Sequence, residues 1–155
     1  MKLSTKSRYG VRALFDIAYN SGTLPAQIQD ISRRQNISPR YLEQIFQVLK
    51  KAGILKSKRG PQGGYCLTRN PDEITLKEIV TATEGGLALV DCVGGKRKKK
   101  NACDSDGCCV TQPVWEEATA LLHEYFAGLT LKNLCERGAA MGVKKEQDAR
   151  FMYYI

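Results

Sequence analysis

Two short amphipathic segments separated by a tight turn constrain the fold of this chain most. The first segment, residues 27–35, places Ile28 and Ile31 on one side and stops at Asn36, a residue type that tolerates the left-handed backbone conformation. The second segment begins at Ser38-Pro39, an N-cap residue followed by proline at the first helical position. Its apolar side chains then recur at positions i, i+3, i+4 and i+7: Leu42, Ile45, Phe46 and Leu49. This pattern predicts a helix-turn-helix whose second helix covers 38–51.

An ordinary helical hairpin would show the same periodicity, and the residues that follow separate the two interpretations. Two short stretches typical of strands, 54–57 and 65–68, flank a tip at 58–64 that contains three glycines and one proline. Glycine and proline keep such a turn thin and allow positive φ angles. Lys58 and Arg59, at the base of the tip, can reach phosphates or a narrow minor groove. The sequence therefore predicts a β-hairpin wing and a winged helix-turn-helix.

Charge is distributed unevenly along the 155 residues. Residues 1–69 contain 13 Lys and Arg against three acids, whereas residues 70–155 contain 11 Lys and Arg against 13 acids. A basic half beside a nearly neutral half indicates that one region meets a polyanion, although a solvated basic face would give the same count. Together with the helix pair and the wing, this favours double-stranded DNA as the partner.

The expected roles follow from side-chain chemistry. The start of a recognition helix enters the major groove, where arginine suits guanine, glutamine suits adenine and glutamate can accept from cytosine. The predicted DNA-binding residues are Ser38, Arg40, Tyr41, Glu43 and Gln44 on the helix, and Lys58, Arg59, Gly60, Pro61 and Gly63 in the wing.

The rest of the chain is predicted to be mainly helical. A first helix is expected over 4–20, and Thr75-Leu76-Lys77-Glu78 forms a capping box for a helix that runs to about Thr83. From Pro113 a long helix carries a wide apolar face, which predicts a dimerisation helix; packing onto its own domain is the alternative. A short helix beginning at Thr130 follows. We expect a winged helix-turn-helix at 1–84, a cysteine-rich loop at 85–112, the dimerisation and short helices at 113–136, and a weakly patterned tail at 137–155.

One stretch of 18 residues in the glycine-containing loop holds four cysteines: Cys92, Cys103, Cys108 and Cys109. Such a loop can bend thiolates toward one centre, so a metal or iron–sulfur site is the leading interpretation. Their spacing is wider than that of zinc-ribbon knuckles. A zinc site, a thiol redox switch and a loop of unligated thiols remain as alternatives. Cys66 and Cys135 are interpreted as packing residues.

The chain resembles the iron–sulfur cluster regulator (IscR-type) family of winged helix-turn-helix transcriptional regulators, from its first residues to about Arg137. The matching stretches are 2–10, 30–32, 37–38, 41–44, 59–61 and 63–65. The resemblance implies a homodimer, two winged helices on a palindromic operator, and a [2Fe–2S] cluster in the loop before the dimerisation helix. In that family the state of the cluster changes which promoters are bound.

The resemblance also implies a ligand set of three cysteines followed by a histidine. Cys92, Cys103 and Cys109 fit the cysteine positions, although the first gap is five residues longer and contains the basic run 96–100. Gln112 occupies the histidine position, and a neutral amide is a poor ligand for thiolate-held iron. Cys108 and His123 are weaker candidates for the fourth ligand, and His123 is expected on the solvated face of the long helix.

We therefore predict a cytoplasmic, homodimeric regulator that senses iron–sulfur cluster status. A metal-free, thiol-sensing winged-helix regulator is one alternative, and a cluster-bearing electron-transfer protein is another. No catalytic arrangement, small-molecule substrate site or membrane segment is expected, since no apolar run approaches the roughly 20 residues needed to cross a bilayer.

Overall fold

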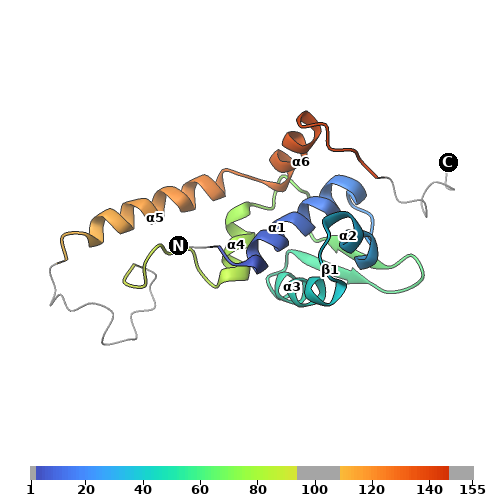
Figure 1. Cartoon of the computed structure of the whole chain (residues 1–155), viewed down its shortest axis with the longest axis horizontal. Helices are drawn as coiled ribbons and strands as arrows, with labels where there is room; N and C mark the ends of the chain where they lie inside the picture. Colours follow the sequence, from blue (N-terminus) through green and yellow to red (C-terminus); the bar gives the residue numbers. More distant parts are fainter. Residues whose placement is uncertain (1–2, 94–108, 147–155) are drawn as a thin grey trace.

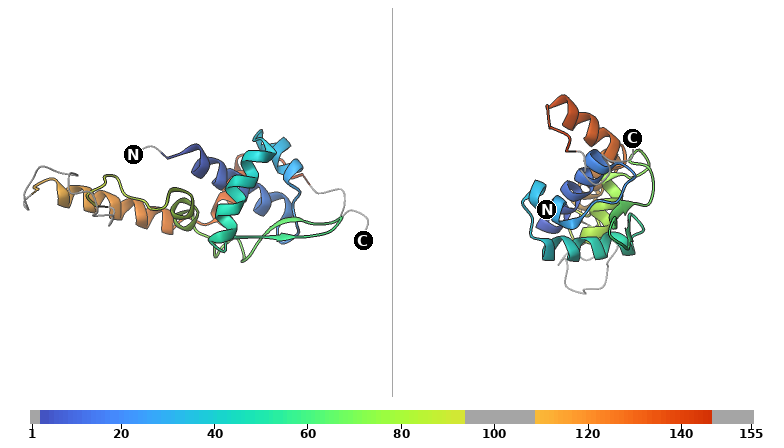
Figure 2. Two further views of the ribbon diagram at one scale, coloured as in Figure 1. Left: turned by 90° about the horizontal axis from the view of Figure 1, so that it is seen from below. Right: turned by 90° about the vertical axis from the view of Figure 1, so that its right-hand side faces the viewer.

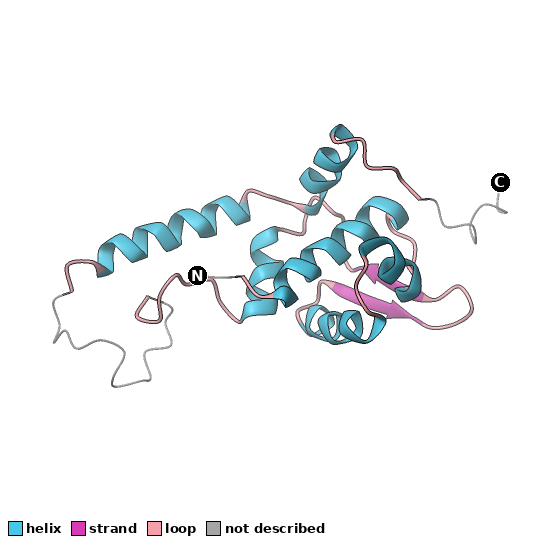
Figure 3. Ribbon diagram, viewed as in Figure 1, coloured by secondary structure: helices cyan, strands magenta, loops and turns pink. Residues whose placement is uncertain are grey.

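The computed structural model describes residues 3–93 and 109–146. A compact body holds α1 (Thr5–Asp16), α2 (Ile28–Gln35), α3 (Pro39–Lys51), the hairpin strands β1 (Leu55–Lys58) and β2 (Gly64–Leu67), and α4 (Leu76–Glu84). The long helix α5 (Gln112–Ala127) projects away from this body, and α6 (Leu131–Ala140) returns to it (Figures 1 and 3). The predicted class, mainly α with one β-hairpin wing, is confirmed.

Side-chain caps set where most helices begin. Ser4, Ser38, Thr75 and Thr130 each accept a hydrogen bond from a backbone N–H in the first turn of the following helix. At Thr75 the predicted capping box is complete, because Glu78 also accepts from the Thr75 backbone N–H. The sequence placed these starts correctly because a cap depends only on neighbouring residues.

The bounds of several elements differ from the sequence prediction. The helix expected over 4–20 changes at Ile17 from α1 into a π-helical turn, Ile17–Ser21, before Gly22 ends it. Both strands are displaced by one residue from the predicted ranges. The last helix extends to Ala140, beyond the boundary expected at 136, since its final turn packs against α1: a Cβ on the buried Gly138 would lie 2.9 Å from the Phe15 ring.

Helix α1 lies at the centre of the body and contacts α2, α3, α4 and α6. Its buried residues meet the inward faces of α3 and α4, and Phe46, Leu14, Leu42, Leu49 and Ile79 are among the largest fully buried side chains. Burying each such side chain contributes about 2 kcal/mol. This core fixes α3 on one side of the body, and Figure 2 shows α6 on the opposite side.

The hairpin is attached to the body by a third piece of extended chain. Strands β1 and β2 pair antiparallel, from Leu55 opposite Leu67 to Lys58 opposite Gly64. The Ala26 N–H donates to the Tyr65 carbonyl at 2.9 Å, and the Tyr65 N–H donates to the Ala26 carbonyl at 2.8 Å. The connection between α1 and α2 thereby fixes the direction of the wing.

Helix α5 is the least buried element. Thr119 is its only buried residue, while Val114, Trp115, Leu121 and Tyr125 are at least 40% exposed. The helix packs against α4 near its C-terminal end. Across residues 3–93 and 109–146, no helix is both long enough and apolar enough to traverse a bilayer.

Candidate DNA-binding interface

Helix α3 separates its faces as the sequence predicted. Leu42, Ile45, Phe46 and Leu49 are fully buried, whereas Arg40, Glu43, Gln44 and Gln47 are exposed. Asn36 adopts the left-handed conformation, with φ of 52°, and turns the chain between α2 and α3. The Ser38 side chain accepts from the Tyr41 N–H at 3.3 Å, so it caps the helix end that would face a base pair.

Tyr41 is less available for contact with DNA than the sequence suggested. Its half-buried ring makes an edge-to-face contact with Tyr9 of α1, with ring centroids 6.0 Å apart. The Arg12 guanidinium lies 5.3 Å from the centre of the Tyr9 ring. Arg12 also donates to the Gln35 carbonyl oxygen at the end of α2. These contacts place a basic, aromatic edge of α1 beside the start of α3.

The wing lies next to α3 and is joined to it at two points. The Lys50 ammonium donates to the Ser57 hydroxyl at 2.9 Å. The Phe46 ring of α3 packs against the Tyr65 ring of β2, with the ring centroids 4.6 Å apart. Lys56, Lys58 and Arg59 are exposed along the same hairpin. The recognition helix and the basic wing therefore form one continuous surface.

The candidate DNA-binding residues of the wing tip differ in exposure and in role. Lys58, Arg59, Gly60 and Pro61 are exposed, but Gly63 is buried. The Gly63 N–H donates to the Gly60 carbonyl at 2.9 Å, and a Cβ at Gly63 would lie 2.3 Å from the Lys58 carbonyl oxygen. Gly63 therefore shapes the tip from beneath, and its close backbone approach explains why glycine occurs there.

Glu43 is the one acid among nine Lys and Arg between residues 31 and 69. Burial raises the pKa of the Tyr65 hydroxyl, and the negative charge of Glu43 raises it further. The charge of Glu43 on α3 is thus felt by Tyr65 on the neighbouring strand β2. An exposed carboxylate in a basic surface can accept from a cytosine amino group or repel a misplaced phosphate.

Sequence reasoning missed Lys50, Lys56 and Ser57 as parts of this surface. Lys50 and Lys51 form the basic last turn of α3, which was visible in the sequence. That Lys50 points toward β1 depends on how the hairpin folds back on the helix.

The structure describes part of the cysteine-rich segment. Cys92 is half-buried at the end of segment 85–93, and Cys109 is half-buried three residues before α5, with its Sγ 3.2 Å from the Thr111 hydroxyl. Cys103 and Cys108 lie outside the described residues. Cys66 and Cys135 are a buried and a half-buried thiol in the body, as expected of packing residues, and burial raises the pKa of Cys135.

Gln112, in the histidine position, and His123, a weaker ligand candidate, both already have partners. Gln112 begins α5 and its amide donates to the Glu116 carboxylate at 2.8 Å. The prediction that His123 is solvated is wrong: it is half-buried, and its Nε2 lies 2.8 Å from the Leu87 carbonyl oxygen. No group of three or more His, Cys, Asp or Glu that could hold a metal ion occurs within 3–93 and 109–146.

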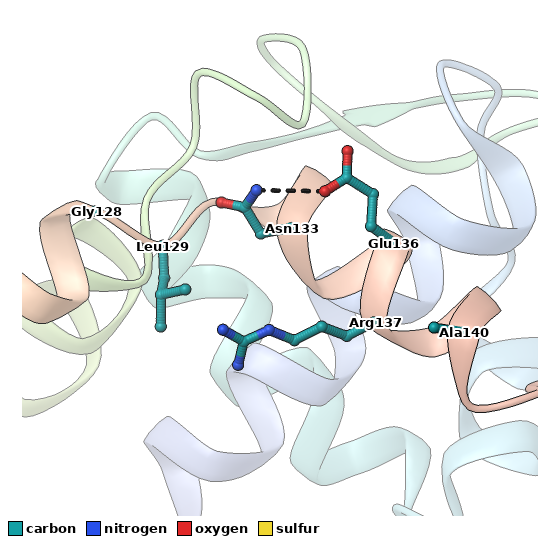
Figure 4. A pocket seen from close by; sticks show the side chains of 6 residues that line it. All are labelled: Gly128, Leu129, Asn133, Glu136, Arg137 and Ala140. Atoms are coloured by element: carbon teal, nitrogen blue, oxygen red, sulfur yellow. Dashed lines mark hydrogen bonds between the residues drawn. The ribbon is translucent and has the colours of Figure 1, made fainter.

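A shallow groove lies where α5 meets α6. It is lined by Gly128, Leu129, Asn133, Glu136, Arg137 and Ala140, and the Asn133 amide donates to Glu136 at 3.4 Å (Figure 4). Because α6 and α3 lie on opposite sides of the body, this groove is separate from the surface formed by α3 and the wing.

The geometry has counterparts among known proteins. Residues 3–137 match the model of the Rrf2 family, described as iron-dependent transcriptional regulators. The HTH-type transcriptional regulator IscR of Sodalis glossinidius is 35% identical over 148 residues, which cover 96% of this chain and 87% of that protein.

Two solved structures share the fold. IscR from T. potens is 33% identical, covers 99% of this chain and 97% of its own, and has a TM-score of 0.72. CymR, the global cysteine regulator of B. subtilis, is 30% identical, covers 88% of this chain and 98% of its own, and has a TM-score of 0.74. These relatives are named as regulators rather than enzymes. The chain belongs to the Rrf2 family of transcriptional regulators.

Proposed function

We propose that this regulator is a cytoplasmic homodimer that binds a palindromic operator with α3 and the wing, and that its cysteine-rich segment holds a [2Fe–2S] cluster. One observation carries the DNA-binding assignment. The exposed face of α3 and the basic hairpin form one surface, joined by the Lys50–Ser57 hydrogen bond and the Phe46–Tyr65 ring contact. A helix and a wing held rigidly together can enter adjacent grooves of one duplex.

The capped N-terminal turn of α3 is assigned to the major groove. Arg40 and Gln44 are exposed there with polar groups that match guanine and adenine edges, and Glu43 between them selects against misplaced contacts. Ser38 and Tyr41 lie at the same end of α3 and are assigned to contacts with the DNA phosphate backbone. Lys58, Arg59, Gly60 and Pro61 form the exposed wing, which is assigned to phosphates or the minor groove. Gly63 contributes the shape of the tip.

Dimerisation is assigned to α5. A helix with Val114, Trp115, Leu121 and Tyr125 exposed presents an apolar face that a monomer rarely leaves in water. Covering this face with the same face of a second copy gives a two-fold symmetric dimer. Two recognition helices related by that axis would meet half-sites about 34 Å apart, one turn of DNA.

The cysteine-rich segment is assigned to the cluster by the chemistry of its donors. Cysteine thiolates are the usual ligands of iron–sulfur clusters, and Cys92, Cys103 and Cys109 would hold it. Gln112 does not fit the fourth position, because its amide is a poor ligand and already donates to Glu116. When bound, the cluster supplies a redox-active, oxygen-sensitive centre. Cys92 and Cys109 both lie in the chain that joins α4 to α5, so a group that they held would link the two helices.

The DNA assignment is tested by fluorescence anisotropy with labelled operator fragments. We expect affinity to fall steeply between 50 and 200 mM salt, as counterions are released. Replacing Arg40 or Gln44 by alanine is expected to weaken the preferred site by about tenfold and relax base preference. Arg59→Ala is expected to weaken all sequences more evenly. Unchanged binding in all three variants would contradict the assignment.

The cluster assignment is tested by purification without oxygen. A red-brown protein with about two iron and two sulfide per chain supports it, and a colourless protein without metal contradicts it.

A metal-free thiol sensor is the second candidate. It is favoured by Gln112 in place of a histidine and by similarity to a structure of oxidised CymR from Staphylococcus aureus, at 29% identity and a TM-score of 0.69. That candidate predicts DNA affinity that depends on peroxide and is restored by a thiol reductant, with no bound iron.

A further inference from the structure

Two side chains of α5 hold the backbone of the segment that leads to Cys92. His123 Nε2 lies 2.8 Å from the Leu87 carbonyl oxygen. Because a carbonyl oxygen only accepts, Nε2 carries a proton and donates it. The Thr119 hydroxyl oxygen accepts from the Leu89 N–H at 3.4 Å. We call segment 85–93 the strap, since both bonds fasten it along α5.

The spacing of the two bonds shows how the strap runs. Thr119 and His123 are four residues apart in a helix, a separation of about 6 Å along its axis. Leu87 and Leu89 are two residues apart, and two residues of chain can span up to about 7 Å. One turn of α5 therefore matches two residues of the strap. The order is reversed, with the later strap residue bonded to the earlier helix residue, so the strap runs antiparallel to α5.

Burial supports a packed strap rather than a chance contact. Leu87 is 4% exposed and Thr119 is 8% exposed, and Thr119 is the one buried residue of α5. The strap leaves α4 through Gly85 and Gly86, whose φ angles are 78° and 155°. Glycine at both positions lets the chain turn sharply from α4 onto α5.

The antiparallel direction carries the chain toward the N-terminal end of α5. Cys92 follows Leu89 by three residues, and Cys109 precedes α5 by three residues. In Figures 1 and 2 the chain after α4 runs alongside α5 toward that end. Beyond Leu89 the strap closes a turn, in which the Val93 N–H donates to the Val90 carbonyl at 3.2 Å, and Cys92 lies in this turn. The two bonds to α5 therefore fix the chain immediately before the turn that carries Cys92.

We propose that His123 and Thr119 are positioning residues that set Cys92 for the cysteine site by fixing the strap to α5. The proposal rests on the proposed function in taking Cys92 as a functional thiol. It also gives His123 a role other than ligand, since Nε2 is committed to the strap. A change in the cysteine segment would then reach α5 directly through these two bonds.

The first experiment uses metal-free protein and does not depend on a cluster. Amide hydrogen exchange is followed in peptides that cover 87–93, and the rate of Cys92 alkylation by iodoacetamide is followed by mass spectrometry. His123→Phe keeps a ring and loses the donor, whereas His123→Gln keeps an N–H donor. Thr119→Val loses the hydroxyl at constant shape, whereas Thr119→Ser keeps it. Glu117→Gln, on an exposed position of α5, is the control.

We expect exchange at Leu89 and alkylation of Cys92 to rise about fivefold in His123→Phe and Thr119→Val, the factor that loss of one ordinary hydrogen bond gives. His123→Gln, Thr119→Ser and Glu117→Gln should stay within twofold of the parent protein. If both rates are unchanged in His123→Phe and Thr119→Val, the proposal is overturned.

The second experiment uses protein purified without oxygen and follows its visible circular dichroism after exposure to air. We expect the signal to decay several-fold faster in His123→Phe and Thr119→Val, with rescue by Gln and Ser. If the strap exchanges faster but the signal and its lifetime are unchanged, the strap does not position the site. If the parent protein binds no iron, the proposed cluster fails, and the Cys92 alkylation rates still decide whether these residues position the thiol.

Discussion

The Arg34 guanidinium donates to both carboxylate oxygens of Asp16, through Nε at 3.0 Å to each and through a terminal nitrogen at 2.6 Å to one. Asp16 is fully buried at the end of α1, and the Arg34 side chain is 12% exposed at the end of α2. The Gln35 amide donates to the same carboxylate at 2.9 Å. This pair fixes the first helix of the helix-turn-helix to the central helix of the body.

Asp16→Asn is expected to destabilise the fold by about 3 kcal/mol, because it leaves the nearly buried Arg34 charge with only the exposed Glu146 carboxylate, 3.9 Å away, as a counterion. Urea unfolding followed by circular dichroism measures this. Glu146→Gln is the comparison at the surface: it removes an exposed carboxylate that lies 2.7 Å from Arg33 and 3.9 Å from Arg34, and screening by water should leave the unfolding midpoint nearly unchanged. Equal effects of the two substitutions on stability would contradict the expectation that the buried ion pair matters more than the exposed one.

Gly64→Ala is expected to detach the wing from the connection before α2. A Cβ there would lie 2.3 Å from the Ala26 carbonyl oxygen, and the φ angle of 154° disfavours any side chain. The strain should cost about 2 kcal/mol, and operator affinity should fall because the wing loses its direction. Gln62→Ala, at the exposed tip, provides the comparison in both assays and should leave stability unchanged.

Stability should decrease in acid partly through Glu78. Burial alone would raise the pKa of this carboxyl, but hydrogen bonds from Thr75 and Arg69 lower it below its ordinary 4.5. A folded-state pKa below the unfolded value stabilises the fold above about pH 4.5, and that stability is lost as the pH falls through the folded pKa.

Glu78→Gln should therefore be less stable than the parent at pH 7, with the difference vanishing toward pH 3. Urea unfolding at a series of pH values measures this. Glu124→Gln, at an exposed carboxylate of α5, controls for the loss of one charge. A difference that stays constant from pH 7 to pH 3 would show that Glu78 acts through packing alone.

Leu121→Glu is expected to convert the proposed dimer to monomer, because Leu121 is 67% exposed on the apolar face of α5. Two carboxylates facing each other across a two-fold axis would disfavour association. Light scattering coupled to gel filtration gives the mass. Circular dichroism should show an intact fold, and operator affinity should drop at least tenfold with the loss of the second half-site. A monomeric parent protein would contradict the dimer itself.

Most of the fold could be predicted from local sequence. The caps at Ser38 and Thr75 and the left-handed turn at Asn36 depend on residues close together in the chain. The inward face of α3 followed from helical periodicity. The tip glycines predicted the wing, although the close approach of Gly63 to Lys58 and of Gly64 to Ala26 required the folded chain.

Tertiary structure decided the rest, because it depends on contacts between distant residues. Tyr41 became a partner of Tyr9, and Lys50 became a link to Ser57. His123 was predicted to be solvated because periodicity places it off the apolar stripe. It donates to Leu87 because the chain after α4 folds back along that polar side of α5. The sequence by itself determined the helices, the wing and their chemistry; the folding back of hairpin and strap decided which side chains remain free to bind.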